Sequence, residues 1–181
     1  MATLYEHYNT GDNNAELTDA LWVCSHTFTP QITHNITLVK LKVYRLGNPG
    51  TITVGIRATS GGVPTGSNLT SGAFNGDAIT TDGDGDWIEV ELTPYRLSVS
   101  TKYAIVLTSL AEHDSNSLYW RSEANSPIYT RGALCWSNDG GLSWTEYPNQ
   151  DMMFEEWGNP VAKGNPNVDQ LLYRHVERID R

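Results

Sequence analysis

Apolar and polar residues alternate in segment after segment between residues 28 and 110, and this feature most constrains the fold of the chain. Side chains of a β-strand point alternately to its two faces, so a spacing of two buries one face and leaves the other in water. Turn residues separate the alternating segments about every 8–12 residues, the rhythm of an antiparallel sandwich. The sequence therefore predicts an all-β fold, an antiparallel jelly-roll-like β-sandwich with short N- and C-terminal arms. The expected strands are 22–29, 36–46, 51–59, 69–74, 86–93, 102–110, 117–121, 133–137, 142–147 and 152–157.

Length and composition indicate one domain with two extensions. A chain of 181 residues can bury one well-filled core, and is too short for two full domains. The polar residues 1–20 are expected to form an N-terminal arm, and residues 21–157 the sandwich. Residues 158–167 contain two Pro and two Gly, which break helix and strand alike, so this segment is predicted to be a linker.

The C-terminal segment, residues 168–181, has the pattern of an amphipathic helix. Its apolar residues, spaced close to a helical face, are Val168, Leu171, Leu172, Val176 and Ile179. A helix this short is only marginally stable alone in water, so we expect it to pack against another protein surface. We expect an assembly element that joins copies into a homo-oligomer or lattice, or binds other virion or cell-surface proteins. The alternative is that it folds back onto its own sandwich.

Charge and hydropathy argue against two classes of partner. The net charge is −9 and no run of Lys or Arg occurs, which disfavours nucleic-acid binding because phosphate contacts need clustered cations. No stretch of about 18 apolar residues is found, so no membrane insertion is expected. Residues 1–11 lack the features of a secretory signal. We therefore expect the protein to assemble in a host cytoplasm; the alternative is that a signal peptide was removed beforehand.

The two cysteines, Cys24 and Cys135, lie in apolar strand-like contexts. Buried free thiols are the expected state, because a domain of this size has core enough without a covalent link. A disulfide between the two is the alternative that the sequence leaves open.

Five segments of the predicted sandwich match a known module in their strand and turn residues. They are 28–30 (FTP), 38–50 (LVKLKVYRLGNPG), 54–58 (VGIRA), 64–66 (PTG) and 97–106 (LSVSTKYAIV). Over about residues 22–157, the chain resembles the β-sandwich module often labelled choice-of-anchor or carbohydrate-binding-like. The resemblance implies a scaffold found in bacterial secreted and surface proteins and in structural proteins of tailed phages. It brings no catalytic residues, because the shared positions are those of the scaffold.

Residues 137–144 (SNDGGLSW) match the Asp-box pattern Ser-x-Asp-x-Gly-x-x-Trp of sialidase-type propeller blades. In that pattern Ser and Asp brace a tight hairpin through hydrogen bonds to the backbone, while Trp packs beneath it. A propeller needs several copies at a fixed period, and the motif occurs once here. We therefore interpret it as a braced hairpin without sialidase function.

Asp82, Asp84 and Asp86 begin a calcium-loop pattern that the following residues do not complete. Trp87 stands where the pattern needs Gly, and Thr93 where it needs the bidentate acidic ligand. A solvated acidic turn is the favoured interpretation. We expect no metal and no cofactor.

Aromatic residues carry the prediction of a binding site. The chain has 6 Trp and 9 Tyr against 3 Phe, so most of its large aromatic side chains carry a polar N–H or O–H group. Such rings can stack on the C–H faces of sugars beside polar groups that bond the hydroxyls. About half should instead lie in the core. The candidates are Tyr119, Trp120, Tyr129, Trp136, Trp144 and Tyr147.

No arrangement of residues with catalytic spacing is apparent. Glu155 and Glu156 are neighbours on an expected strand, so they point to opposite faces and cannot act together. No two histidines have metal-ligand spacing; they are His7, His26, His34, His113 and His175. The chain is therefore expected not to be an enzyme.

Two functions fit these expectations. The first is a non-enzymatic structural or attachment protein of a virion, such as a phage capsid decoration, neck or tail accessory protein. The alternative is a carbohydrate-binding module of a secreted bacterial enzyme or adhesin, located outside the cell or on its surface. The two are chemically compatible, because a virion protein can bind host glycans.

Overall fold

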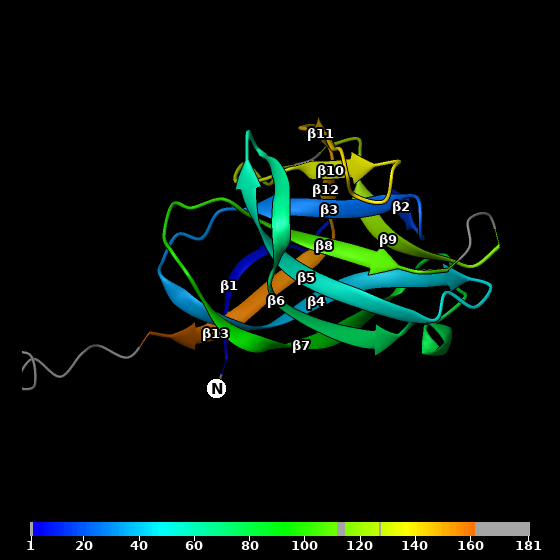
Figure 1. Cartoon of the computed structure of the whole chain (residues 1–181), viewed down its shortest axis with the longest axis horizontal. Helices are drawn as coiled ribbons and strands as arrows, with labels where there is room; N and C mark the ends of the chain where they lie inside the picture. Colours follow the sequence, from blue (N-terminus) through cyan, green and yellow to red (C-terminus); the bar gives the residue numbers. More distant parts are fainter. Residues whose placement is uncertain (1, 112–114, 127, 162–181) are drawn as a thin grey trace, which may run out of the picture.

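The computed structural model describes residues 2–111, 115–126 and 128–161, which form two antiparallel β-sheets packed face to face (Figure 1). The all-β sandwich predicted from the alternation is thereby confirmed. The first sheet contains β1 (Thr3–Tyr8), β2 (Asn14–Thr18), β4 (His34–Leu46), β7 (Asp86–Leu97), β9 (Ser117–Glu123), β12 (Asp151–Met152) and β13 (Phe154–Pro160). The second contains β3 (Val23–Phe28), β5 (Thr51–Ser60), β6 (Val63–Asn75), β8 (Tyr103–Ser109), β10 (Leu134–Ser137) and β11 (Thr145–Tyr147). A short 3-10 helix, η1 (Gly76–Ala78), follows β6.

The first sheet forks along the long strand β4. One edge of β4 pairs with β7, while its other edge pairs with β13 at one end and with β9 at the other. The segment β12–β13 passes from β9 to β4 and fills this fork. The second sheet is a simple ladder in the order β11-β10-β3-β8-β5-β6.

The N-terminal residues belong to the first sheet, which corrects the expected arm. β1 pairs with β13, and β2 pairs with β9. The polar composition was misleading because β1 buries a charged residue: Glu6 is fully buried and accepts hydrogen bonds from Tyr129 and Arg131. A strand whose inward residue is charged lacks the apolar signal on which the sequence prediction relied.

The predicted linker also begins inside the sheet. Gly158 lies in β13 opposite Ile36 of β4, and a Cβ atom at Gly158 would lie 2.2 Å from the backbone oxygen of Asn35. Here glycine is needed for close strand packing and does not mark a domain boundary. The remaining linker residues from 162 onward lie outside the described residues. So does the predicted docking segment with Val168, Leu171, Leu172, Val176 and Ile179, and its role stays a prediction.

The core fills the space between the sheets. Its largest fully buried side chains include Trp120, Phe28, Phe154, Leu41 and Leu107. The indole Nε1 of Trp120 donates a hydrogen bond to the carbonyl of Met153 at 2.8 Å, which satisfies its only polar atom inside the core. Among the described residues, no helix has the length and apolar character needed to cross a membrane.

The two long edges of the sandwich differ. At one edge β6 lies directly on β7: the hydroxyl of Thr70 donates to the carbonyl of Thr93 at 2.5 Å, and Gly72 approaches the backbone of Glu91 closely. At the opposite edge, β2 of the first sheet faces β10 and β11 of the second, and a pocket lies between them. The open edge is therefore where a ligand can reach the inner face of a sheet.

Both cysteines are free and buried. The strand register places Ser25 opposite Cys135, and Cys24 opposite Trp136. Neighbouring residues of a strand point to opposite faces, so the two thiols lie on opposite sides of the second sheet and cannot bond. Burial raises the pKa of Cys135 to about 12 and raises that of Cys24 as well, which keeps both thiols protonated.

Candidate functional site

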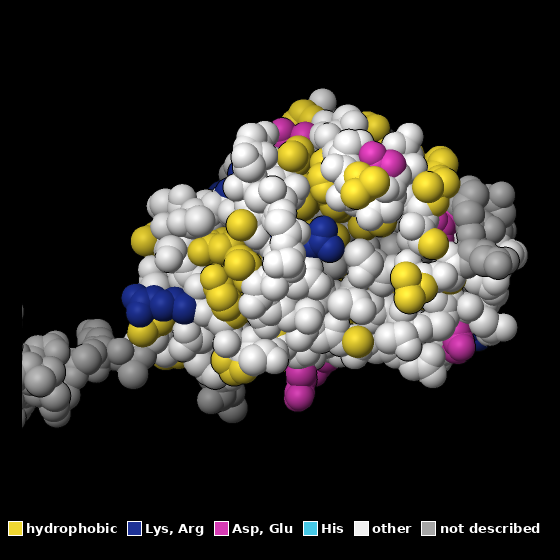
Figure 2. All heavy atoms as spheres, in the orientation of Figure 1, with side chains coloured by type: hydrophobic (Ala, Val, Ile, Leu, Met, Phe, Trp, Pro, Cys, Tyr) yellow, Lys and Arg dark blue, Asp and Glu magenta, His cyan; other side chains and the backbone are white. Residues whose placement is uncertain are grey.

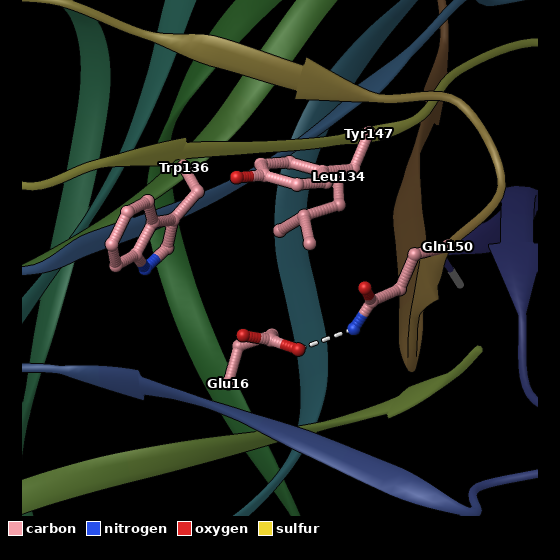
Figure 3. A pocket seen from close by; sticks show the side chains of 5 residues that line it. All are labelled: Glu16, Leu134, Trp136, Tyr147 and Gln150. Carbon is pink, nitrogen blue, oxygen red and sulfur yellow. Dashed lines mark hydrogen bonds between the residues drawn. The ribbon is translucent and has the colours of Figure 1, made fainter.

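A pocket of about 240 Å³ opens between the two sheets at the edge formed by β2, β10 and β11 (Figure 3). Its walls come from segments far apart in the sequence: Glu16 lies on β2, Leu134 and Trp136 on β10, Tyr147 on β11, and Gln150 just before β12. Trp136 and Tyr147, both expected from the sequence to contact a ligand, are thus brought to one site.

The strand register explains why the apolar walls converge. Leu134 pairs directly with Tyr147 across β10 and β11, and Trp136 lies two residues from Leu134, so all three side chains share one face. This face is the inner one, because Trp136 is also opposite Cys24 of the core. β10 and β11 are the outermost strands of their sheet, so their inner face borders the open edge. Trp22 packs edge-on against Trp136, with ring centroids 4.5 Å apart, and fixes the indole.

The polar wall is formed by Glu16 and Gln150. Glu16 Oε1 accepts hydrogen bonds from Asn14 Nδ2 at 3.0 Å and from Gln150 Nε2, and the same Gln150 nitrogen donates to Ser122 Oγ at 3.1 Å. These bonds hold the carboxylate at the bottom of the view in Figure 3, opposite Tyr147 and Leu134. Burial raises the pKa of Glu16, while the bonds from Gln150 and Asn14 act in the opposite direction.

Three polar atoms at the pocket make no hydrogen bond within the described part of the chain: Glu16 Oε2, Trp136 Nε1 and the Tyr147 hydroxyl. One is an acceptor, one a donor, and the hydroxyl is both. The ring of Tyr147 is accessible as well, since 42% of this residue is exposed. The site therefore combines aromatic faces with hydrogen-bonding groups, the combination by which pockets orient small ligands.

Two of the aromatic candidates are core residues, and this corrects the prediction for them. Trp120 is fully buried, and Tyr129 is 8% exposed, with its hydroxyl donating to Glu6 at 2.9 Å. Both rings pack among the buried residues of the core. Neither ring is available to a ligand.

The remaining two candidates lie away from the pocket. Tyr119 stacks on Tyr44 of the neighbouring strand, with ring centroids 4.7 Å apart. Trp144 packs on a small cluster of Val23, Ala104 and Val106 on the outer face of the second sheet. Figure 2 shows hydrophobic side chains in the hollow between the β5–β6 hairpin and the β10–β11 hairpin. Trp144 thus serves packing at that face.

Glu16 and Gln150 were missed in the sequence. Glu16 lies in the segment expected to be an arm, and its neighbours indicated no strand. Gln150 precedes a strand of two residues, which has no detectable periodicity. Only the pairing of β2 with β9 brings Glu16 to the pocket, and a single sequence gives no sign of that long-range contact.

The Asp-box forms the braced hairpin predicted from its sequence. Asp139 Oδ1 accepts from the backbone N–H groups of Leu142 and Ser143, each at 2.9 Å, and Ser143 Oγ donates to Asp139 Oδ2 at 2.5 Å. Ser137 Oγ accepts from the N–H of Gly141 at 2.8 Å, and Gly141 has a φ of 87°, which glycine adopts without strain. These bonds fix the connection between β10, which carries Trp136, and β11, which carries Tyr147.

The Asp139 carboxylate makes the stability of this hairpin depend on pH. Hydrogen bonds from Ser143, and then from Ser137 and the loop backbone, lower the pKa of Asp139 to about 2 from its ordinary 3.8. A lowered pKa in the folded state stabilises the fold above the unfolded pKa, and this stabilisation is lost as the pH falls towards 2. In thermal unfolding, the difference between the wild type and Asp139→Asn should be largest above about pH 4 and should narrow below it. A difference that stays constant from pH 7 to pH 2 would contradict this assignment.

The three aspartates of the acidic turn lie at its surface. Asp82, Asp84 and Asp86 are all exposed, and the N–H of Asp84 donates to Asp82 Oδ1 at 3.1 Å, which is a local turn bond. Among the described residues, no group of three or more His, Cys, Asp or Glu side chains is placed to hold a metal ion.

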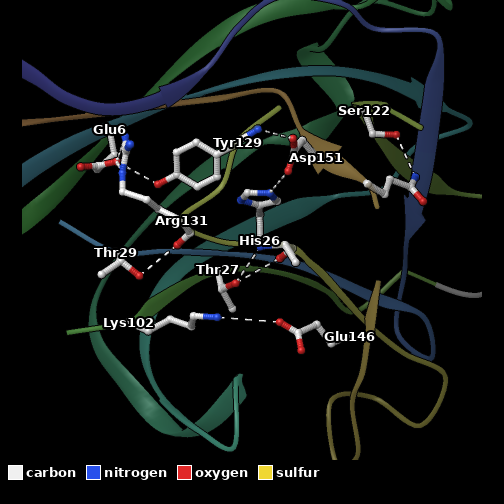
Figure 4. A network of polar contacts seen from close by, with 12 residues as sticks. Glu6, His26, Thr27, Thr29, Lys102, Ser122, Tyr129, Arg131, Glu146 and Asp151 are labelled. Carbon is white, nitrogen blue, oxygen red and sulfur yellow. Dashed lines mark hydrogen bonds and ion pairs between the residues drawn. The ribbon is translucent and has the colours of Figure 1, made fainter. Parts of the chain in front are cut away.

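A buried polar network links the N-terminal strand to the rest of the sandwich (Figure 4). Glu6 Oε2 accepts from the Tyr129 hydroxyl at 2.9 Å and from Arg131 Nη2 at 2.6 Å. On the same side of the molecule, Asp151 accepts from the N–H of Tyr129 at 2.8 Å and lies 3.4 Å from His26 Nε2. Each buried carboxylate therefore has a partner, as a buried charge requires.

His34 and Glu156 form a second buried pair, joined by 2.8 Å between Nε2 and Oε1. Both are fully buried, and Tyr5 stacks on His34 with ring centroids 3.7 Å apart. Glu155 is on the opposite face, where it accepts from Asn9 at 3.0 Å, so the predicted separation of the two glutamates is confirmed. Nothing in the sequence indicates that Glu156 pairs with a histidine. Because His34 and Glu156 are both closed off from solvent, the pair serves the packing of β13 against β4.

Comparison of the sequence with models of protein families found no match, and comparison with curated proteins found none. The resemblance to the choice-of-anchor or carbohydrate-binding-like module therefore stays a prediction. The function must be argued from the pocket itself.

Proposed function

We propose that this protein is a non-enzymatic carbohydrate-binding domain, and that its ligand is bound in the pocket of Glu16, Leu134, Trp136, Tyr147 and Gln150. The observation that carries the proposal is the convergence of two partly exposed aromatic rings with three hydrogen-bonding atoms that have no partner within the described residues. A sugar ring has apolar C–H faces and hydroxyls at its rim, so aromatic rings and polar atoms both find partners on it.

The size of the pocket suits a single ring better than an extended ligand. Pockets for drug-sized molecules occupy roughly 300–1,000 Å³, and this one is about 240 Å³. A terminal sugar, or one unit of a chain that continues into solvent, fits this dimension.

Binding is favoured over hydrolysis by the number of carboxylates. Glycoside hydrolysis generally uses a pair of Asp or Glu residues that flank the bond to be broken. Glu16 is the single carboxylate among the residues that line this pocket. The other paired acids described above, Glu6 and Glu156, are fully buried in the network around β1 and β13.

A glycan array followed by calorimetry tests the proposal. We expect the wild type to bind a subset of glycans, and Trp136→Ala to weaken binding by roughly tenfold or more, the cost of removing a central aromatic contact. Trp87→Ala is the matched control, because Trp87 is an exposed tryptophan (37%) on β7 of the other sheet. Both variants must melt cooperatively before the affinities are compared.

Two results would contradict the proposal. The first is that no glycan on the array is bound by the wild type. The second is that binding is unchanged in the double variant Trp136→Ala, Tyr147→Ala, which would place the site elsewhere on the protein.

Attachment within a virion is the wider role that the sequence favours, and the proposed pocket is compatible with it. The open edge presents Trp136 and Tyr147 away from β6 and β7, so the rest of the sandwich remains accessible for assembly contacts. The virion role, its partners and the location in a virion or at a cell surface stay predictions.

A further inference from the structure

We propose that the pocket selects sugars that carry a free, positively charged amino group, and that the Glu16 carboxylate is the group that recognises it. This inference rests on the proposed carbohydrate-binding function and adds the chemical class of the ligand. It is carried by the position of one carboxylate oxygen and by the charges around it.

Glu16 presents one oxygen to the pocket and uses the other for its own positioning. Oε1 accepts the bonds from Asn14 and Gln150, while Oε2 has no partner among the described residues and lies on the Trp136 side in Figure 3. A ligand ammonium can therefore bond Oε2 without displacing any bond within the protein. Hydrogen bonds between two charged groups are the stronger kind, so this contact discriminates an amine from a hydroxyl.

The aromatic walls act in the same direction. Trp136 and Tyr147 line the pocket together with Glu16, and the faces of both ring types attract cations through their quadrupoles. A cation held between these faces and the carboxylate is stabilised both by the aromatic rings and by the negative charge of Glu16. A neutral N-acetyl group at the same place gains neither of these two attractions.

The local charges disfavour an acidic sugar. The pocket is lined by one carboxylate and by no Lys or Arg, and the chain as a whole has a net charge of −9. A sialic acid or uronic acid would bring a second negative charge beside Glu16 without a cation to balance it. Burial also raises the pKa of Glu16, and a ligand cation would lower it again.

Calorimetric titration with two matched ligands tests the inference. Oligomers of glucosamine and of N-acetylglucosamine, equal in length, are titrated at pH 6.5 and moderate salt into the full-length protein. We expect the amino form to bind roughly tenfold tighter, the size of one charge-assisted hydrogen bond. Glu16→Gln keeps the shape and one acceptor oxygen, and should reduce this preference to less than about threefold. Glu91→Gln, at an exposed position of β7, removes the same charge elsewhere and should leave the preference unchanged.

The outcomes separate the two proposals. Equal binding of both oligomers, lost in Trp136→Ala, overturns the amine preference and leaves carbohydrate binding intact. A preference for the amino form that is the same in the wild type, Glu16→Gln and Glu91→Gln also overturns it, because the attraction then does not depend on the Glu16 carboxylate. Tighter binding of the N-acetylated form overturns it as well. If neither these oligomers nor any glycan on the array binds, both proposals are wrong.

Discussion

Replacing Trp120 by alanine is expected to lower the free energy of unfolding by about 3–5 kcal/mol, the usual cost of removing a large aromatic side chain from a core. Trp120 is fully buried where β9 meets β4. Its removal leaves a cavity between the sheets and deprives the Met153 carbonyl of its 2.8 Å hydrogen bond. Met153 connects β12 to β13, so the fork of the first sheet loses its central contact.

Denaturant unfolding of the variant and of a control measures this effect. Trp87→Ala removes the same side chain from the partly exposed surface of β7 and should change the free energy of unfolding by about 0.5 kcal/mol or less. If Trp120→Ala is no more destabilising than this control, the assignment of Trp120 to the core is wrong. Trp120 would then again be a candidate for contact with a ligand.

Replacing His34 by leucine is expected to cost about 3–5 kcal/mol, because it leaves the Glu156 carboxylate buried without a partner. The two side chains are fully buried and 2.8 Å apart, and the His34 Nδ1 lies 2.7 Å from the carbonyl of Ile32. Nδ1–H donates a hydrogen bond to that carbonyl, so in the charged imidazolium Nε2–H donates to Glu156. Chemical denaturation at pH 6 measures the loss.

A double-mutant cycle separates the pair from the loss of side-chain volume. His34→Leu together with Glu156→Leu should be less destabilising than His34→Leu alone, since an apolar pair needs no charge compensation. His7→Leu, on the exposed face of β1, is the control for a histidine without buried contacts. A double variant that is as unstable as the sum of the single variants would refute the coupling.

The same pair gives stability a dependence on pH. Burial alone lowers the pKa of His34, but the hydrogen bond and the negative charge of Glu156 outweigh it, and the pKa is raised above its ordinary 6.5. A raised pKa in the folded state stabilises the fold fully below the unfolded pKa, and this contribution is lost as the pH rises through the folded pKa. The wild type should therefore lose stability above about pH 6.5 more steeply than the double variant His34→Leu, Glu156→Leu, which lacks both titrating groups.

The sequence was sufficient for the strands whose inward residues are apolar. β4, β5 and β8 coincide with the predicted segments 36–46, 51–59 and 102–110 to within two residues at each end. In β4 and β5 apolar side chains alternate with polar or small ones, and the periodicity indicates the buried face directly, while β8 is a continuous apolar run that is buried on both faces. The Asp-box hairpin was predictable for a similar reason, because all its bonds join residues close in sequence.

The sequence failed where burial depends on distant partners. Glu6 and Glu156 are charged and yet fully buried, and what makes this tolerable is a partner more than a hundred residues away in each case. No local pattern distinguishes such a glutamate from one on a solvated arm. For this reason the sequence predicts an arm where the structure has β1.

The candidate site was predictable only in part, for the same physical reason. Aromatic content identified Trp136 and Tyr147, but it selected Trp120 equally, since both tryptophans lie on strands and point to the inner face. What distinguishes them is the order of strands: β10 lies next to the edge of its sheet, while β9 lies between β2 and β4. Only that order turns one inward tryptophan into a pocket wall and the other into core.

The indole N–H signals of the protein in a heteronuclear NMR titration with a bound glycan test carbohydrate binding most directly. Each of the 6 tryptophans gives its own signal, and single substitutions assign them. We predict that the Trp136 signal shifts in a saturable manner as the sugar is added, while the signal of the buried Trp120 stays in place. A saturable shift at other tryptophans with Trp136 unchanged would contradict the assignment of this pocket as the binding site.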